Sequence, residues 1–176
     1  GDRIPSRIYP VKIQALERLT DDIVGLSVVT PRNQVLSWHG GQYATLKQGA
    51  GLVRHYSIAN VDPASRQIDF HIKLVEGGAF SAWLRETAKV GDLLQLEGPL
   101  GRFHWRSLQA SRTWLFATGT GIVPIYAMLH AATPDQIRDA GKIELVWGNR
   151  YVRDAYLDER LRELSKQLGM GYTTVF

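Results

Sequence analysis

The order of strand-like and helix-like segments changes near residue 111, and this change most limits what the chain can fold into. Before it come six short segments rich in β-branched and aromatic residues, at VKIQALERL, IVGLSVVT, GQYATLKQG, RHYSIAN, QIDFHIKLV and DLLQLEGPLG. One helical pattern, AFSAWLRETA, interrupts them and places Phe80 and Leu84 on one face. Short strands at this spacing are typical of antiparallel barrels, so the first half predicts a Greek-key β-barrel of about six strands.

The second half alternates strand-like and helix-like segments. Strand TWLFAT is followed by the turn GTG, helix IVPIYAMLHAA, strand KIELVWG, helix YLDERLRELSKQL and strand YTTVF. A βαβαβ order of this kind predicts an α/β domain with a parallel sheet. The switch in pattern over residues 107–112 predicts a domain boundary, with one domain at 1–108 and the other at 109–176.

Composition excludes several classes of site. The formal net charge of +4, without a dense basic run, favours phosphate-bearing ligands or an acidic protein partner over nucleic acid. The absence of cysteine excludes thiolate zinc sites and iron–sulphur clusters held by these residues, and the five histidines lack ligand spacing, so we expect no metal site. No apolar run approaches a membrane span and the first residues, GDRIPSRIYP, do not form a signal peptide, so we expect a cytoplasmic protein without membrane insertion.

The segment RHYSIAN combines four different polar chemistries in consecutive positions. Alternation along a strand places Arg54 and Tyr56 on one face and His55 and Ser57 on the other. A layered ligand with charge at one end would suit this arrangement. The alternative is a half-buried strand in which the tyrosine packs and the arginine extends along the surface.

The segment EGGAFSAWL predicts a glycine turn that leads into a helix. The first helical N–H groups, over Gly78, Ala79, Phe80 and Ser81, have no partner within the helix and favour an anion such as phosphate. The alternative is an ordinary turn in which Ser81 caps the helix or stands in its first turn. A guanidinium such as that of Arg54 would complete a pyrophosphate site with charge-assisted hydrogen bonds.

The segment FATGTGIVPIYAML places a glycine turn between a strand and a helix. Gly119, Thr120 and Gly121 are therefore candidates for binding a dinucleotide pyrophosphate, although Pro124 stands where a third glycine would complete the usual fingerprint. A tight turn without a ligand is the alternative. Arg150 follows the second parallel strand, where a ribose or its phosphate is often bound, although a surface arginine is equally ordinary there.

The order of these motifs resembles the ferredoxin–NADP reductase superfamily, especially its bacterial oxygenase-reductase and flavin-reductase members. Arg54, Tyr56 and Ser57 match the family's R-x-Y-S motif, GGAFS its flavin-pyrophosphate turn, GPLGRF its barrel-closing segment and ATGTGIVPI its nicotinamide-nucleotide loop. The resemblance implies FAD against the barrel and hydride delivery from NADH or NADPH bound to the α/β domain.

The resemblance also implies roles for individual residues. Tyr56 would lie against the isoalloxazine, Ser57 would face flavin N5, and Arg54 would bind phosphate. Tyr56 and Ser57 are therefore the candidate catalytic residues. The family pattern further places backbone groups of residues 72–74, Ile72, Lys73 and Leu74, beside the flavin or its linker.

Two departures from the family pattern stand out. Gly40 replaces the proline of the usual Pro-Gly-Gln-Tyr turn, which loosens this loop. The chain stops at Phe176, in what should be the third parallel strand, whereas the family continues with two further strands. In the family's strand order, segment TWLFAT then loses a neighbour and exposes an apolar edge, so we expect the sequence to be part of a longer chain.

The function implied is an oxidoreductase that passes electrons from NAD(P)H through FAD to a protein or small acceptor. The acceptor could be a ferredoxin, a flavodoxin, an oxygenase component or free flavin, and the choice between NADH and NADPH stays open. One alternative is an FAD-binding electron-relay or regulatory module without efficient NAD(P)H oxidation. A third is a barrel with an interaction role and no ligand.

Overall fold

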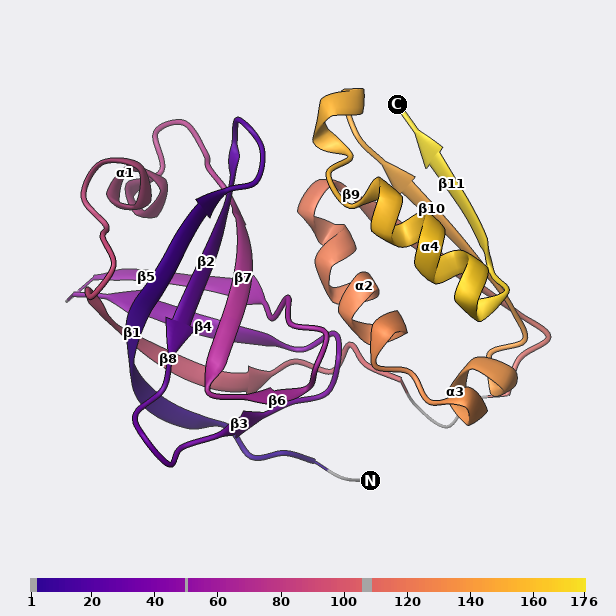
Figure 1. Cartoon of the computed structure of the whole chain (residues 1–176), viewed down its shortest axis with the longest axis horizontal. Coiled ribbons are helices and arrows are strands. Elements are labelled where there is room, and N and C mark those ends of the chain that lie inside the picture. The colour runs from indigo at the N-terminus through magenta and orange to yellow at the C-terminus, as the bar shows by residue number, and fades with distance from the viewer. Residues whose placement is uncertain (1–2, 50, 106–108) are drawn as a thin grey trace.

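The computed structural model describes residues 3–49, 51–105 and 109–176, which form a barrel and an α/β unit side by side (Figure 1). The barrel is a six-stranded antiparallel sheet in the order β5-β4-β8-β1-β2-β7. Its strands are β1 (Arg7–Arg18), β2 (Ile23–Val29), β4 (Tyr43–Gln48), β5 (Leu52–Ser57), β7 (Gln67–Lys73) and β8 (Leu93–Leu100). The predicted six-stranded antiparallel barrel is confirmed.

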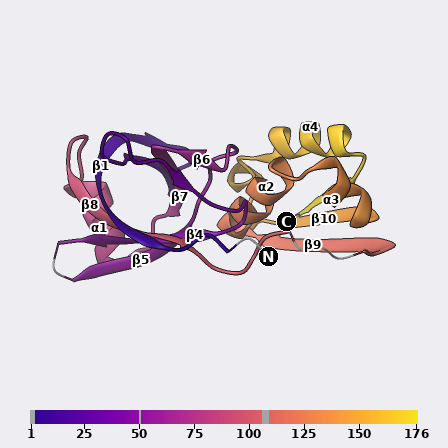
Figure 2. The ribbon, with the colours of Figure 1, turned by 90° about the horizontal axis from the view of Figure 1, so that it is seen from below.

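The barrel curls because one face of each strand is apolar. In β7, Ile68, Phe70 and Ile72 are fully buried, whereas the alternate residues face outward. Register shifts in β1 and β4 add local bends, which help a sheet to close. Figure 2 shows the result as a ring seen nearly end-on.

Two small features of the barrel unit lie outside the main sheet. Helix α1 (Ala79–Glu86) buries Phe80 and Leu84 as predicted, and it packs beside β5. A two-stranded sheet of β3 (Leu36–Ser37) and β6 (Ala64–Ser65) was not predicted, because two residues per strand are too few to show a period.

The second unit is a parallel sheet in the order β11-β10-β9. Its elements are β9 (Arg112–Thr118), the short helix η1 (Gly119–Gly121), α2 (Ile122–His130), α3 (Pro134–Asp139), β10 (Lys142–Gly148), η2 (Val152–Asp154), α4 (Asp158–Leu168) and β11 (Gly171–Val175). The predicted βαβαβ order is confirmed, with α3 as an unpredicted addition. The predicted boundary between 108 and 109 adjoins residues 106–108, which lie outside the described residues, and we propose that the linker falls between β8 and β9.

The three α-helices of this unit lie on one face of its sheet (Figure 2). On β9, at the sheet edge, Trp114 is 51% exposed and Phe116 is 68% exposed, and the two rings stack 5.9 Å apart. Strand β9, from TWLFAT, is an edge strand of the described sheet, and these two aromatic side chains are exposed on one of its faces.

The two units meet closely at Gly40. A Cβ atom at this position would lie 2.7 Å from the carbonyl oxygen of Ala127, in α2. Nearby, the Trp105 indole Nε1 donates to the Met128 carbonyl oxygen at 2.8 Å, and Ala59 also packs on the α/β core. Gly40, which departs from the family turn, therefore permits close approach of the two units.

We expect Gly40→Ala to lower the free energy of unfolding by about 1–3 kcal/mol, the usual cost of overpacking, because a backbone carbonyl has little freedom to move. Denaturant unfolding measures this change. The matched control is Gly51→Ala, because no atom lies within 4 Å of a Cβ built there. Equal stability of the two variants would contradict the packing role of Gly40.

Candidate functional site

Tyr56 and Ser57 end strand β5 and are both half-buried. The Tyr56 ring lies 5.7 Å from that of Phe80 and 6.5 Å from that of Phe70, between centroids. Burial, partly offset by the positive charge of Arg54, raises the pKa of Tyr56 to about 12. Tyr56 therefore stays a neutral phenol with an aromatic surface anchored to α1.

Arg54 is exposed on the same strand. One guanidinium nitrogen donates to the Val53 carbonyl oxygen at 2.7 Å, and a guanidinium has further N–H donors. Because β5 packs beside α1, and Tyr56 of β5 contacts Phe80 of α1, Arg54 and the start of this helix belong to one side of the barrel. The predicted pairing of Arg54 with the glycine turn is compatible with this placement.

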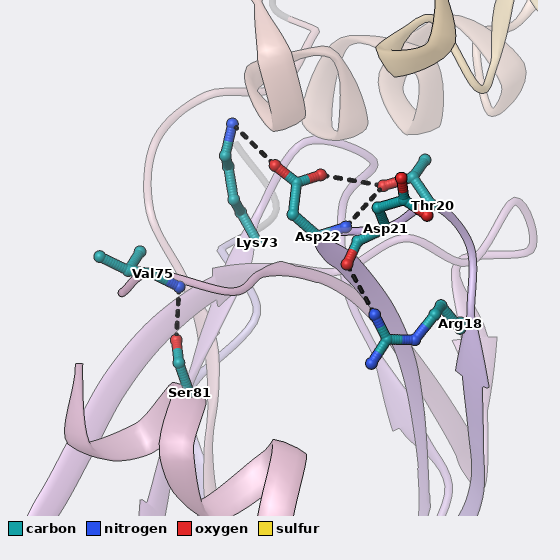
Figure 3. Close-up of polar contacts among 7 residues, drawn as sticks. All are labelled: Arg18, Thr20, Asp21, Asp22, Lys73, Val75 and Ser81. Carbon is teal, nitrogen blue, oxygen red and sulfur yellow. Dashed lines mark hydrogen bonds and ion pairs between the residues drawn. The ribbon is translucent and has the colours of Figure 1, made fainter. Parts of the chain in front are cut away.

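The start of α1 is fixed by an internal hydrogen bond. Gly78 is the N-cap residue, and the Ser81 hydroxyl accepts the Val75 N–H at 2.8 Å (Figure 3). Ser81 thus stands in the first turn of the helix, which was one of the two alternatives for this segment, and it stabilises the preceding loop. The first turn contains no acidic residue, so its N–H groups at Ala79 and Phe80 suit an anion.

The candidate residues 72–74 close one edge of the barrel sheet. The side chains of Ile72 and Leu74 are buried in the core, so these two residues could bind a ligand only through their backbone. Lys73 is exposed, and its ammonium group pairs with the Asp22 carboxylate at 3.6 Å (Figure 3).

Strand register distinguishes the three backbones. The Leu74 N–H donates to the Asp22 carbonyl oxygen at 2.7 Å, and Ile72 lies opposite Val24 in β2. Because hydrogen-bonding direction alternates along an antiparallel strand, Ile72 faces β2 as well, whereas the N–H and C=O groups of Lys73 face away from it. Of the three residues, Lys73 therefore offers backbone groups to a ligand.

The glycine turn lies at the carboxyl end of β9, as predicted. Gly119 has a φ of +52°, which favours glycine, and no atom lies within 4 Å of a Cβ built at Gly119 or Gly121. The Trp147 indole Nε1 donates to the Gly119 carbonyl oxygen at 3.0 Å and so anchors the turn. Pro124 stands in the first turn of α2, where its missing N–H costs little.

Two adjoining cavities lie between the barrel and the α/β unit. The cavity next to the glycine turn has a volume of about 560 Å³, and its lining includes Lys73, Gly119, Thr120 and Arg150. The structure thus brings together four candidates from three separate segments. The second cavity, about 620 Å³, shares Lys73 and Arg150 with the first. Neither cavity is lined by the group on β5 and α1, which comprises Arg54, Tyr56, Ser57 and residues 78–81.

Sequence reasoning missed a contact between the units at His71 and Tyr156. The His71 Nδ1 and the Tyr156 hydroxyl lie 2.8 Å apart, and their rings meet at 5.4 Å. Burial lowers the pKa of His71 to about 4; the charge of Asp69 acts in the opposite direction, and the charge of Arg160 lowers this pKa further. Burial also raises the pKa of Tyr156. Both groups are therefore neutral near pH 7. Alternation along the strand could have placed His71 on the outer face of the barrel, but it could not have identified Tyr156 as its partner.

Comparison with known families agrees with this geometry. Residues 10–105 match the oxidoreductase FAD-binding domain family, and residues 115–175 match the oxidoreductase NAD-binding domain family. The chain belongs to the FAD- and NAD-binding oxidoreductases of the ferredoxin–NADP reductase type, as its motifs indicated.

Curated relatives include reductase components of larger systems. The chain is 32% identical over 167 residues to the xylene/toluene monooxygenase electron transfer component of Pseudomonas putida, covering 92% of this chain and 46% of the relative. It is 32% identical over 155 residues to the CDP-6-deoxy-L-threo-D-glycero-4-hexulose-3-dehydrase reductase of Yersinia pestis, covering 88% of this chain and 46% of the relative. The chain thus spans about half the length of these relatives.

A solved structure shows the same architecture. The ferredoxin reductase in carbazole 1,9a-dioxygenase superposes with a TM-score of 0.78 at 27% identity, covering 98% of this chain and 51% of that one. Within the described residues, no helix is long and apolar enough to cross a membrane.

The pKa of His71 leads to a pH prediction. Because its pKa in the folded protein, about 4, lies below the ordinary histidine value of 6.5, neutral His71 stabilises the fold above pH 6.5, and this contribution is lost as the pH falls from 6.5 towards 4. We expect the stability difference between the wild type and His71→Gln to shrink over this window. Denaturant unfolding at several pH values measures it, with His130→Gln, at an exposed site, as the control. A constant difference would contradict the burial of His71.

Proposed function

We propose that the chain is the FAD- and nucleotide-binding part of a reductase that passes electrons from NAD(P)H through FAD to a redox protein. The observation that carries this proposal is the cavity in which Lys73, from the edge strand of the FAD-binding domain, meets Gly119, Thr120 and Arg150 of the NAD-binding domain. A flavin and a nicotinamide must meet for hydride transfer, and this cavity is bounded by the two matching domains.

The residues present fit FAD. Tyr56 provides a neutral aromatic surface, Lys73 provides backbone donors and acceptors, and the start of α1 with Arg54 provides for the negative charge of a pyrophosphate. When bound, FAD accepts a hydride and releases electrons one or two at a time. The protein's part is to bind and orient it. Ser57 would offer a small hydroxyl near N5 that leaves room for hydride approach.

The residues of the glycine turn fit a dinucleotide. The open space beside Gly119 and Gly121 admits a pyrophosphate close to the backbone, and the start of α2 adds favourable N–H groups. Arg150 is exposed beyond β10 and lines both cavities, where it would meet a ribose or its phosphate.

The acceptor we propose is a ferredoxin or an oxygenase component. Support comes from the relatives, one of which is an electron transfer component of a monooxygenase and another a ferredoxin reductase in a dioxygenase. The formal charge of +4 suits an acidic protein partner.

Stopped-flow mixing with NADH or NADPH tests the proposed function. The FAD-loaded protein should lose its visible flavin absorbance in a saturable manner, with dithionite as the control for reducibility. The 176-residue chain and the longest natural form are compared. An FAD-loaded natural form that dithionite reduces, but neither NADH nor NADPH does, would indicate an FAD-binding relay module instead.

Arg54→Ala should weaken FAD binding roughly tenfold to a hundredfold, because a charge-assisted hydrogen bond to phosphate contributes about 1.5–3 kcal/mol. Titration of the stripped protein with FAD measures this change. The control is Arg32→Ala, another exposed arginine, which lies on the loop between β2 and β3. Unchanged FAD affinity of Arg54→Ala would remove Arg54 from the site.

Ser57→Ala should keep FAD bound but slow its reduction. A neutral hydrogen bond contributes about 1 kcal/mol, so the single-turnover rate of reduction should fall roughly fivefold. Matched FAD titrations show that binding is unchanged. A wild-type rate in this variant would rule out a role of the hydroxyl in hydride transfer.

A further inference from the structure

The barrel and the α/β unit meet at several places, since Ala59 and Val61 pack on the α/β core and β7 lies against η1. Two further contacts are well defined. The first lies near the C-terminal end of α2, where Gly40 and Trp105 meet Ala127 and Met128. The second is the contact between His71 of β7 and Tyr156, which lies between η2 and α4. The contact at His71 is a side-chain hydrogen bond that joins strand β7 to the α/β unit, so it is directional as well as close.

Tyr156 continues the second attachment to the glycine turn. Its ring lies 6.2 Å from that of Trp147 at an interplanar angle of 74°, and Trp147 is fully buried. The Trp147 indole Nε1 in turn donates to the Gly119 carbonyl oxygen at 3.0 Å. A series of direct contacts therefore connects strand β7 with Gly119, the first residue of the glycine turn.

The two elements that these contacts connect, strand β7 and the glycine turn, both line one cavity. Lys73, two residues after His71 on the same strand, lines it from the barrel. Gly119 lines it from the α/β unit. A shift of Tyr156 relative to His71 would therefore change the distance between these two walls.

We propose that the hydrogen bond between His71 and Tyr156 is a positioning contact that holds the Gly119–Gly121 turn at a fixed distance from strand β7. If the proposed function holds, this contact also places the nicotinamide against the flavin. Misplacing a reacting group by about 1 Å can lower a rate on the order of a hundredfold. His71 and Tyr156 act through the walls of the cavity and are not catalytic residues.

The chemistry of the pair suits a fixed contact. Both side chains are neutral near pH 7, so the hydrogen bond needs no change of charge to form. His71 is faced by Asp69 on its own strand and by Arg160 on α4, whose opposite charges partly cancel. Near pH 7 the contact is therefore a directional hydrogen bond between two uncharged groups.

Tyr156→Phe tests the proposal because it removes the hydroxyl and keeps the ring against Trp147. The matched control is Tyr172→Phe, which removes a hydroxyl that donates to Asp158 at 2.7 Å within the α/β unit. Backbone amide residual dipolar couplings of the FAD-loaded protein report the relative orientation of the two units. A single alignment tensor should fit both units in the wild type and in Tyr172→Phe, and two different tensors should be needed for Tyr156→Phe.

Kinetics supply the second measurement. In the longest natural form, Tyr156→Phe should bind FAD with wild-type affinity, but the single-turnover rate of flavin reduction should fall between about tenfold and a hundredfold. His71→Ala should behave in the same way. His71→Gln, whose amide still reaches a hydroxyl, should recover most of the rate and the single tensor.

The outcomes separate the two hypotheses. A single tensor for both Tyr156→Phe and His71→Ala would overturn the positioning contact, whatever the kinetics. Two tensors together with a wild-type rate of reduction would overturn its link to hydride transfer. If NADH and NADPH do not reduce the wild-type flavin, the proposed function fails, and the dipolar couplings still decide whether the contact fixes the units.

Discussion

The pairing of strand β7 along its whole length with β2, with its other side bridged at Phe70 to Ile58, is the constraint on which the rest of the structure depends. Its pairing with β2 turns Phe70 and Ile72 into the barrel core and His71 outward to the second unit. The same pairing leaves the backbone of Lys73 directed away from β2. One strand thus contributes to the core, to the proposed flavin site and to the contact between units, because these use different groups of successive residues.

The second unit presents its ligand-binding features at one end of a parallel sheet. Parallel strands bring their carboxyl ends to the same edge, so the glycine turn after β9 and Arg150 after β10 line one cavity although they are distant in sequence. The Trp147 indole N–H donates to the Gly119 carbonyl oxygen and anchors this turn. Its backbone is thus anchored at Gly119 while the space beside Gly119 and Gly121 is open, an arrangement that suits a pyrophosphate bound by N–H groups.

Local pattern was enough to predict the strands of the barrel sheet and of the parallel sheet, and the turns before α1 and α2, but not the short strands β3 and β6. Helix α3 was missed, although Thr133 followed by Pro134 and Gln136 forms a capping box that sequence could have shown. The role of Gly40 could not be predicted, since it depends on Ala127 of another unit. The same holds for His71, whose partner is 85 residues away. Contacts between distant segments have no local period, and these are the contacts that join the two units.

In the proposed site, different parts of the structure bind the flavin and position the nicotinamide nucleotide against it. In the proposed site, residues on β5 and α1 would anchor the flavin at the barrel, where Tyr56 packs on Phe80 and Phe70. The geometry of hydride transfer depends instead on how the second unit sits, since the glycine turn belongs to it. Affinity for FAD and the rate of its reduction are therefore expected to respond to different substitutions, because a change at the contact between His71 and Tyr156 leaves the barrel's own core unaltered.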